Sequence, residues 1–166
     1  MIDLEPIVRE AGGRGLNGDA RDAAAAFLCE WHGGGANEHG SDMECETVVL
    51  AKVRGCSARV MLMLNGRGHW LSGHDFEAQG FASTSGGPSV WAGYAFETRQ
   101  EALQHELAAA AAWFDQIANE TSSCASESLK CDARELTGVL SKMVEGGIAP
   151  ANVAKPVAKA MQLDLF

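Results

Sequence analysis

Basic side chains are scarce in this sequence. Its 166 residues hold 13 Lys and Arg against 22 Asp and Glu, which gives a formal net charge of −9. Residues 1–46 alone carry ten acidic and three basic side chains. Because proteins that hold nucleic acid by bulk electrostatics need clustered Lys and Arg to neutralise phosphates, we expect no strong direct binding to DNA or RNA.

Long apolar runs and a secretory leader are also missing. No stretch of 18 apolar residues occurs, and no charged segment is followed by an apolar one with a small-residue cleavage site. We therefore expect neither a membrane span nor secretion. Cysteine is limited to five residues, an odd number without the spacing of a disulfide scaffold. That usage favours reduced thiols in a cytoplasmic protein.

Signatures of nucleotide enzymes and of reactive thiols are absent as well. The glycine-rich stretches match neither the G-x-x-x-x-G-K-[ST] phosphate loop nor a dinucleotide fingerprint. Cys56 falls in a predicted hairpin turn and is a candidate exposed thiol, but no neighbouring His or Lys marks it as a nucleophile. We expect a non-enzymatic protein without a cofactor.

Two Cys and two His have the right chemistry for a zinc site. Cys29 and His32 form a C-x2-H pair, and His39 and Cys45 form an H-x5-C pair. These are ligand types for tetrahedral zinc. The second pair lies in a predicted loop, however, and no Cys-x2-Cys knuckle fixes it. The favoured interpretation makes Cys29 a buried helix residue and leaves the two histidines facing solvent.

The central part of the chain has the period of β-strands. Residues 48–54 and 58–64 are apolar runs separated by a Gly-Cys-Ser turn, which predicts a hairpin. An Asn-Gly turn leads into a third run, at residues 69–76. A polar loop is expected at residues 79–89 and a fourth strand at residues 90–96. Together these segments predict a meander of three to four antiparallel strands.

Helices are predicted on both sides of these strands. Asp19 is a candidate N-cap for a first helix that ends at Gly33. Thr98 and Glu101 have capping-box spacing and open the clearest helix. Its apolar stripe consists of Leu103, Leu107, Ala110, Phe114 and Ile117. A last helix is expected from a second capping box, Asp132 and Glu135, with Leu136, Leu140, Met143 and Val144 facing inward. Residues 1–145 should form one α+β domain of a sheet packed against helices.

Histidines in the third predicted strand suggest an alternative, enzymatic interpretation. His69, His74 and Asp75 lie close together in the sequence, but a period of two places His69 and His74 on opposite faces. A catalytic pair would need a further group from the loop after Gln79. In the competing and favoured interpretation, Trp70 and Phe76 fill the core or a partner surface, and both histidines are peripheral.

The last five residues carry the most specific pattern in the chain. Gln162, Leu163, Asp164, Leu165 and Phe166 resemble the short peptide by which bacterial polymerases and repair factors dock on the sliding clamp, the β subunit of DNA polymerase III. The resemblance implies that the two leucines and the phenylalanine enter an apolar groove while the Gln162 amide forms hydrogen bonds and Asp164 stays in water. Burying three such side chains is worth about 5–9 kcal/mol before ordering costs, which implies reversible, micromolar binding.

The residues before this peptide have the composition of a linker. Residues 146–160 contain two prolines and two glycines and no helical apolar stripe. Fully extended, they could span up to roughly 50 Å. We therefore assign residues 146–166 to a flexible linker and clamp-binding peptide. The alternative is that Leu-Asp-Leu, which alternates like a short edge strand, docks back on its own domain.

Two weaker resemblances concern the body. Residues 73–96, followed by the helix at Thr98, resemble small uncharacterised phage and plasmid proteins, without implying residue roles. The helix, three-strand, helix order resembles the double-stranded RNA-binding domain. Such domains present lysines at the start of their last helix, whereas here the start of that helix, at Thr98, is acidic on balance. The C-terminal peptide, together with the small size, the acidity and the lack of a catalytic signature, favours a phage or plasmid adaptor or inhibitor that binds the sliding clamp and acts on host replication or repair.

The acidic N-terminal third supports a different hypothesis. An anti-defence protein, of the anti-CRISPR or anti-restriction kind, could use residues 1–46 to block a nucleic-acid-binding host factor. Such binding should be sensitive to salt. The sequence indicates no oligomeric state.

Overall fold

A four-stranded antiparallel sheet and two long helices form the body of the protein. The computed structural model describes residues 1–14, 19, 23–24, 28, 31 and 45–146. The strands follow one another in space in the order β2-β3-β4-β5. They are β2 (Glu46–Val53), β3 (Cys56–Leu64), β4 (Trp70–Ala78) and β5 (Ala82–Gly86). The predicted α+β class and antiparallel meander are confirmed.

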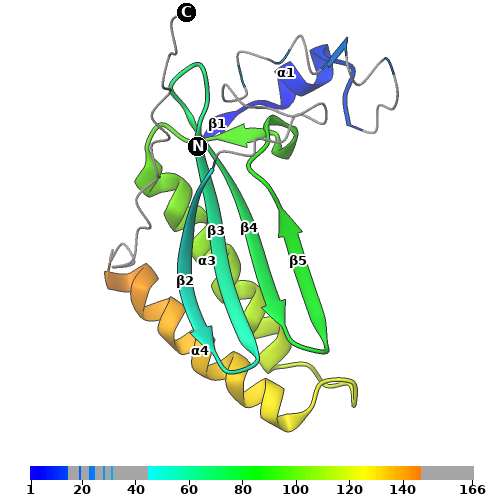
Figure 1. Cartoon of the computed structure of the whole chain (residues 1–166), viewed down its shortest axis with the longest axis vertical. Coiled ribbons are helices and arrows are strands. Elements are labelled where there is room, and N and C mark those ends of the chain that lie inside the picture. The colour runs from blue at the N-terminus through cyan, green and yellow to red at the C-terminus, as the bar shows by residue number, and fades with distance from the viewer. Residues whose placement is uncertain (15–18, 20–22, 25–27, 29–30, 32–44, 147–166) are drawn as a thin grey trace, which may run out of the picture.

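The two helices cover one face of the sheet. Helix α3 (Arg99–Ala118) packs on β3 and β4, and α4 (Glu127–Gly146) packs on β2, β3 and α3 (Figure 1). The predicted capping box at Thr98 and Glu101 is present at the start of α3. All five residues of the predicted stripe of α3 are buried. This helix therefore forms where its caps and its apolar period place it.

Alternation along the strands supplies the other half of this core. Val48 on β2 and Val60 on β3 point toward the helices and are fully buried, whereas Val49 and Arg59 point to the opposite face and are exposed. Because successive side chains of a strand face opposite sides, only one face of each strand joins the main core.

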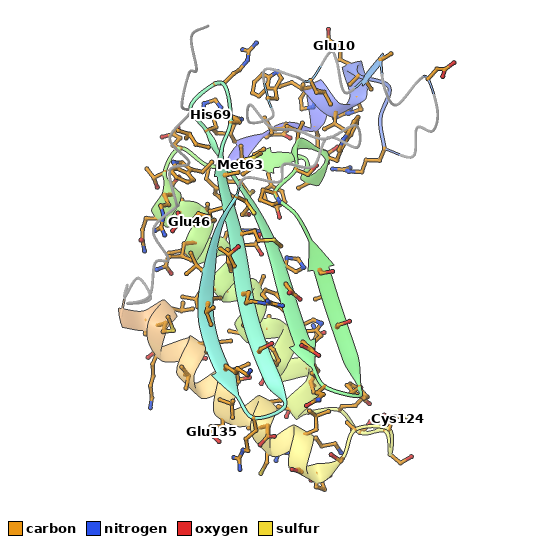
Figure 2. The ribbon with its side chains drawn as sticks, viewed as in Figure 1. Glu10, Glu46, Met63, His69, Cys124 and Glu135 are labelled. Carbon is orange, nitrogen blue, oxygen red and sulfur yellow. The ribbon has the colours of Figure 1, made fainter. Side chains whose placement is uncertain are left out.

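A second, smaller core lies on the other face, at one end of the sheet. It is built around β1 (Ile2–Asp3), α1 (Glu5–Glu10), the short 3-10 helix η2 (Val90–Ala92) and β6 (Tyr94–Ala95). β1 pairs with β6 in a two-stranded sheet. Met63 of β3 lies at this end of the molecule (Figure 2). The buried members of this cluster are Leu4, Val8, Leu28, Met63, Leu71, Val90 and Ala95.

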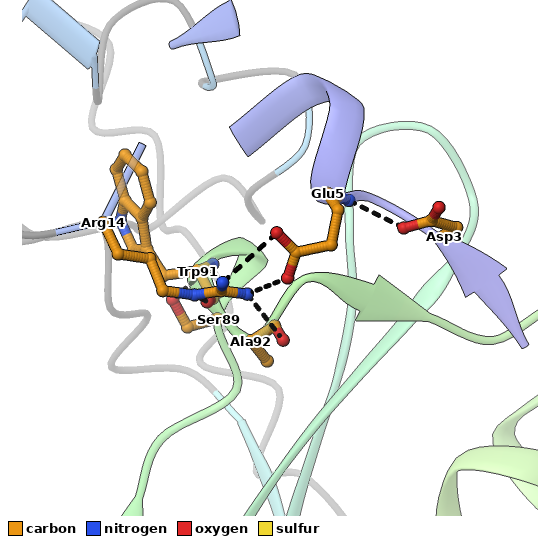
Figure 3. A network of polar contacts seen from close by, with 6 residues as sticks. All are labelled: Asp3, Glu5, Arg14, Ser89, Trp91 and Ala92. Carbon is orange, nitrogen blue, oxygen red and sulfur yellow. Dashed lines mark hydrogen bonds and ion pairs between the residues drawn. The ribbon is translucent and has the colours of Figure 1, made fainter. Parts of the chain in front are cut away.

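Arg14 ties the N-terminal segment to η2. Its guanidinium pairs with the Glu5 carboxylate and donates from Nε to the Trp91 carbonyl at 2.7 Å and from Nη2 to the Ala92 carbonyl at 3.1 Å (Figure 3). Gly93 has a φ of 87°, and a Cβ there would collide with both charged groups. Glycine at this position therefore permits the left-handed turn and the close approach of Arg14.

The structure corrects two sequence assignments after β4. Residues 79–89, predicted as a loop, contain the edge strand β5. Residues 90–96, predicted as the fourth strand of the meander, form η2 and β6. Val90 and Ala95 belong to the second core, whereas Phe96 belongs to the main core. The polar composition of β5 hid its strand character, because an edge strand needs fewer apolar side chains than a central one.

The start of α4 also differs from the prediction. The helix begins at Glu127, so Asp132 and Glu135 lie inside it and form no capping box. Both carboxylates bind Arg54 of the β2–β3 turn, each at 2.9 Å, and Arg54 has a φ of 40°. Figure 2 shows Glu135 close to this end of the hairpin. Leu136 and Leu140 are buried as predicted, but Val144 is exposed.

The structure also corrects the predicted exposure of Cys56. It is the first residue of β3, it is 1% exposed, and it belongs to the main core. Burial, followed by the nearby Asp132 carboxylate, raises the pKa of its thiol to about 11. The residue is therefore a packed core side chain and not an exposed thiol.

Candidate functional site

A group of polar side chains lies between β4, β5 and α3. Ser72, His74 and Phe76 alternate along β4 and all face α3, because each is two residues from the next. Glu106 on α3 meets them from the opposite layer, and only 1% of this residue is exposed. A buried carboxylate at this depth requires hydrogen-bond donors.

Both oxygens of the Glu106 carboxylate accept a hydrogen bond. Ser72 Oγ donates to Oε1 at 2.6 Å, and His74 Nδ1 lies 3.1 Å from Oε2. Burial, followed by the charge of Glu106, raises the pKa of the nearby Tyr94 phenol on β6. The carboxylate is therefore held by two side chains of β4.

The second nitrogen of His74 faces the edge strand. His74 Nε2 lies 3.3 Å from Thr84 Oγ1 on β5. The imidazole stacks on Phe76, with ring centroids 4.5 Å apart and an interplanar angle of 16°. Since 31% of the His74 side chain is exposed, solvent reaches the imidazole although its carboxylate partner is buried.

The electrostatics of the pair follow from these contacts. The hydrogen bond with Glu106 raises the pKa of His74 above its ordinary value of 6.5, although burial opposes this shift. Burial alone would raise the pKa of Glu106, but the hydrogen bonds from His74 and Ser72 bring it below its ordinary value of 4.5. The contacts thus favour the ion pair over the neutral forms of both groups.

The other histidine of this region has a separate environment. His69 precedes β4 and stacks on Trp31, with ring centroids 6.2 Å apart, and Arg67 lies over the same indole at 4.2 Å. His69 and His74 are therefore not one catalytic pair. Asp75, the third candidate, faces away from His74 and pairs with Arg59 of β3.

Comparisons of the chain with protein families, with curated proteins and with solved structures find no match.

The predicted clamp-binding peptide lies outside the described residues. Gln162, Leu163, Asp164, Leu165 and Phe166 follow α4, which ends at Gly146. Residues 147–161 separate them from that helix, which is 15 residues of chain. The peptide and its linker stay predictions from the sequence.

The zinc hypothesis also falls mostly outside the described part of the chain. Cys29, His32 and His39 are not among the described residues, and Cys45 packs, half-buried, against the second core. Within the described ranges, no group of three or more His, Cys, Asp or Glu side chains is arranged to hold a metal ion. The same ranges contain no helix with both the length and the apolar character needed to cross a membrane.

Several charges singled out in the sequence have partners within the protein. Glu46 accepts from Arg99 Nε at 2.8 Å, and Glu5 pairs with Arg14, so two carboxylates of the acidic N-terminal region are engaged. Arg54 and Arg59, basic side chains of the β2–β3 hairpin, pair with carboxylates of α4 and β4. These pairs reduce the charge available to an external partner.

Sequence reasoning found one member of the polar group and missed three. His74 was flagged, but Ser72, Thr84 and Glu106 were not. Glu106 occurs in a helix whose other acidic residues are exposed, and nothing local distinguishes it. One signal in the sequence does indicate its burial: Glu106 lies on the apolar face of the helix, next to Leu103 and Leu107.

Proposed function

We propose that this protein binds the bacterial DNA polymerase III β sliding clamp through residues 162–166, as a phage or plasmid adaptor or inhibitor acting on host replication or repair. By occupying the groove that polymerases and repair factors use, it would bring its folded body to replicating DNA and displace competing ligands.

The peptide sequence carries this proposal. A specific pentapeptide such as Gln-Leu-Asp-Leu-Phe occurs by chance in about one window per million with average residue usage. Its residue types fit their roles, since three apolar side chains can be buried while the acidic one between the leucines remains solvated. Burial of this size supports a reversible contact, as expected of a ligand that exchanges with others.

The organisation of the body is compatible with this role. In the described part of the chain, every fully buried residue of the two cores lies between Leu4 and Leu140, and Met143 is the last residue that packs against them. Between Gly146 and Gln162, 15 residues provide a reach of up to roughly 50 Å. The peptide could thus enter a groove on a partner while the body remains folded.

A pull-down from bacterial lysate tests the proposal. The intact chain should retain the β clamp, identified by mass spectrometry, whereas a chain ending at Ala160 should not. Asp164→Ala serves as a matched control, because this side chain is expected to stay in water and its loss should leave retention unchanged. Equal retention of the clamp by the intact and the shortened chain would show that the peptide is not the binding element.

The net charge of residues 1–46 favours a second candidate, an anti-defence protein that blocks a basic, nucleic-acid-binding host factor. In that case the partner retained in the pull-down is basic, its retention falls steeply with salt, and the chain ending at Ala160 retains it equally well.

A further inference from the structure

We propose that Thr84, His74 and Glu106 form a hydroxyl–imidazole–carboxylate triad in which Thr84 is a nucleophile toward activated acyl groups such as esters. This activity would belong to the body, uses no residue of the C-terminal peptide, and goes beyond the proposed binding of the clamp.

The carboxylate fixes the imidazole in the required form. An ionised carboxylate can only accept hydrogen bonds, and Ser72 Oγ already donates to Glu106 Oε1. His74 Nδ1 must therefore carry the proton that it shares with Oε2 at 3.1 Å. In the neutral imidazole this leaves Nε2 with its lone pair free to act as a base. The stacked Phe76 ring holds the plane of the imidazole.

The Thr84 hydroxyl lies within hydrogen-bonding distance of that base. Thr84 Oγ1 lies 3.3 Å from Nε2, near the upper limit for a hydrogen bond, and such bonds in catalytic sites are often long before a substrate binds. Thr84 is half-buried on β5, the edge strand at the far end of the sheet from β2, on which α4 packs (Figure 1). Its side chain lies on the face covered by α3, because Thr84 is the β5 partner of Phe76. A nucleophile, a base in contact with it and a group that orients the base are the arrangement that activates hydroxyl groups.

A structural role alone accounts poorly for this arrangement. Burying a carboxylate beside an imidazole is costly, and well-packed apolar side chains in their place often give equal or greater stability. Cross-linking α3 to β4 needs only the contacts of Glu106 with Ser72 and His74. It does not need the second imidazole nitrogen to face a partly exposed hydroxyl.

The reaction would proceed in two balanced steps. Thr84 Oγ attacks the carbonyl carbon of the ester, the hydroxyl proton passes to His74 Nε2, and the leaving alcohol takes that proton as its bond to the acyl carbon breaks. Water then attacks the acyl-Thr84 ester, gives a proton to Nε2, and releases the carboxylic acid while Thr84 regains its hydrogen. The products are one acid and one alcohol from one ester and one water.

The pH dependence follows from the groups around His74. Glu106 on α3 and Asp75 on β4 are the charged neighbours that raise its pKa, Tyr94 on β6 and His105 on α3 interact with Glu106, and β5 offers the uncharged Thr84 hydroxyl. Because the base must be neutral, the reaction rate should increase as pH increases through the raised pKa of His74.

A fluorophosphonate probe provides the test, because it traps an activated hydroxyl as a stable phosphonyl ester with loss of fluoride. We expect peptide mass spectrometry to place the adduct on Thr84 of the full chain, with a labelling rate that increases with pH as described. Thr84→Val, which removes the hydroxyl at nearly constant shape, should give no adduct. His74→Gln should slow labelling by about 100-fold or more.

Neighbouring serines are matched controls. Ser83 and Ser85 are exposed on β5 and alternate with Thr84, so Ser83→Ala and Ser85→Ala should keep the adduct and its rate. Circular dichroism checks that each variant is folded. If His74→Gln does not fold, the comparison of the wild-type protein with Thr84→Val is sufficient for the test. Absence of an adduct on Thr84, labelling of all three hydroxyls alike, or an equal rate in folded His74→Gln would overturn the proposal.

Discussion

Three of the four described cysteines lie in contrasting environments. Cys56 is buried and the pKa of its thiol is raised to about 11, whereas Cys124 and Cys131 are exposed. Figure 2 shows Cys124 on the connection between α3 and α4. Since the thiolate is the reactive form, burial and pKa both protect Cys56.

We predict that iodoacetamide at about pH 8 alkylates Cys124 and Cys131 in the native protein at least tenfold faster than Cys56. Peptide mass spectrometry after short exposures gives the rate for each residue. Unfolding in urea should remove the difference. A native-state rate at Cys56 equal to that at Cys124 would mean that β3 does not bury this side chain.

The His74–Glu106 pair predicts how stability depends on pH. His74 has its pKa raised on folding, so its contribution is fully present below pH 6.5 and is lost as pH increases through the raised value. Glu106 has its pKa lowered, so its contribution is present above pH 4.5 and is lost as pH decreases through the lowered value. The two contributions coincide between pH 4.5 and 6.5.

We therefore expect the difference in Tm between the wild-type protein and His74→Gln to be largest in that window and to shrink on both sides. Thermal unfolding followed by circular dichroism between about pH 4 and pH 9 measures it. A difference that stays constant over the whole range would show that the two groups do not interact as a charged pair.

At the scale of elements, the connection after β5 depends on a glycine of β4. A Cβ at Gly73 would collide with the carbonyl oxygen of Gly86 and with the backbone of Gly87 and Pro88. The chain leaving β5 therefore crosses β4 in direct backbone contact, on its way to the second core. Backbone atoms cannot move aside as a flexible side chain can.

We predict that Gly73→Ala lowers the free energy of unfolding by about 1–3 kcal/mol, because the backbone must shift to make room. Gly138→Ala is the matched control. Gly138 lies inside α4 with open space around it, so alanine there should raise stability by about 0.5–1 kcal/mol. Urea titrations give both values, and a neutral Gly73→Ala would contradict the close crossing.

Elements with strong local signals could be predicted from the sequence. The stripe of α3 and its capping box agree with each other, and the apolar runs of β2, β3 and β4 are long enough to identify the strands. Strand β5 could not be found in this way, because Ala82–Gly86 is polar and its pairing with β4 comes from the tight turn before it. Residues 90–96 were wrongly predicted as a fourth strand of the meander, because they are apolar but form η2 and β6.

The candidate site was only partly predictable, for a related reason. His74 and the segment after Gln79 were linked in the sequence as possible partners, and the structure places Thr84 of that segment beside His74. Glu106 is 32 residues from His74 in the chain, and their contact depends on how α3 crosses the sheet. Pairings across layers leave no local pattern.

Across the whole molecule, we expect the chain to divide into a folded body and a C-terminal binding peptide. The described body has its own two cores, and the peptide follows after 15 residues beyond α4. The proposed affinity therefore depends on the last residues, and the stability of the body should not.

The most direct test is a calorimetric titration of purified β clamp into the full-length protein. We predict saturable binding in the micromolar range, with loss of the heat signal in a Leu165→Ala, Phe166→Ala variant that unfolds at the same temperature as the wild-type protein. Asp164→Ala should bind as tightly as the wild type. Binding of equal affinity in the Leu165→Ala, Phe166→Ala variant, or no binding by the intact chain, would contradict the account.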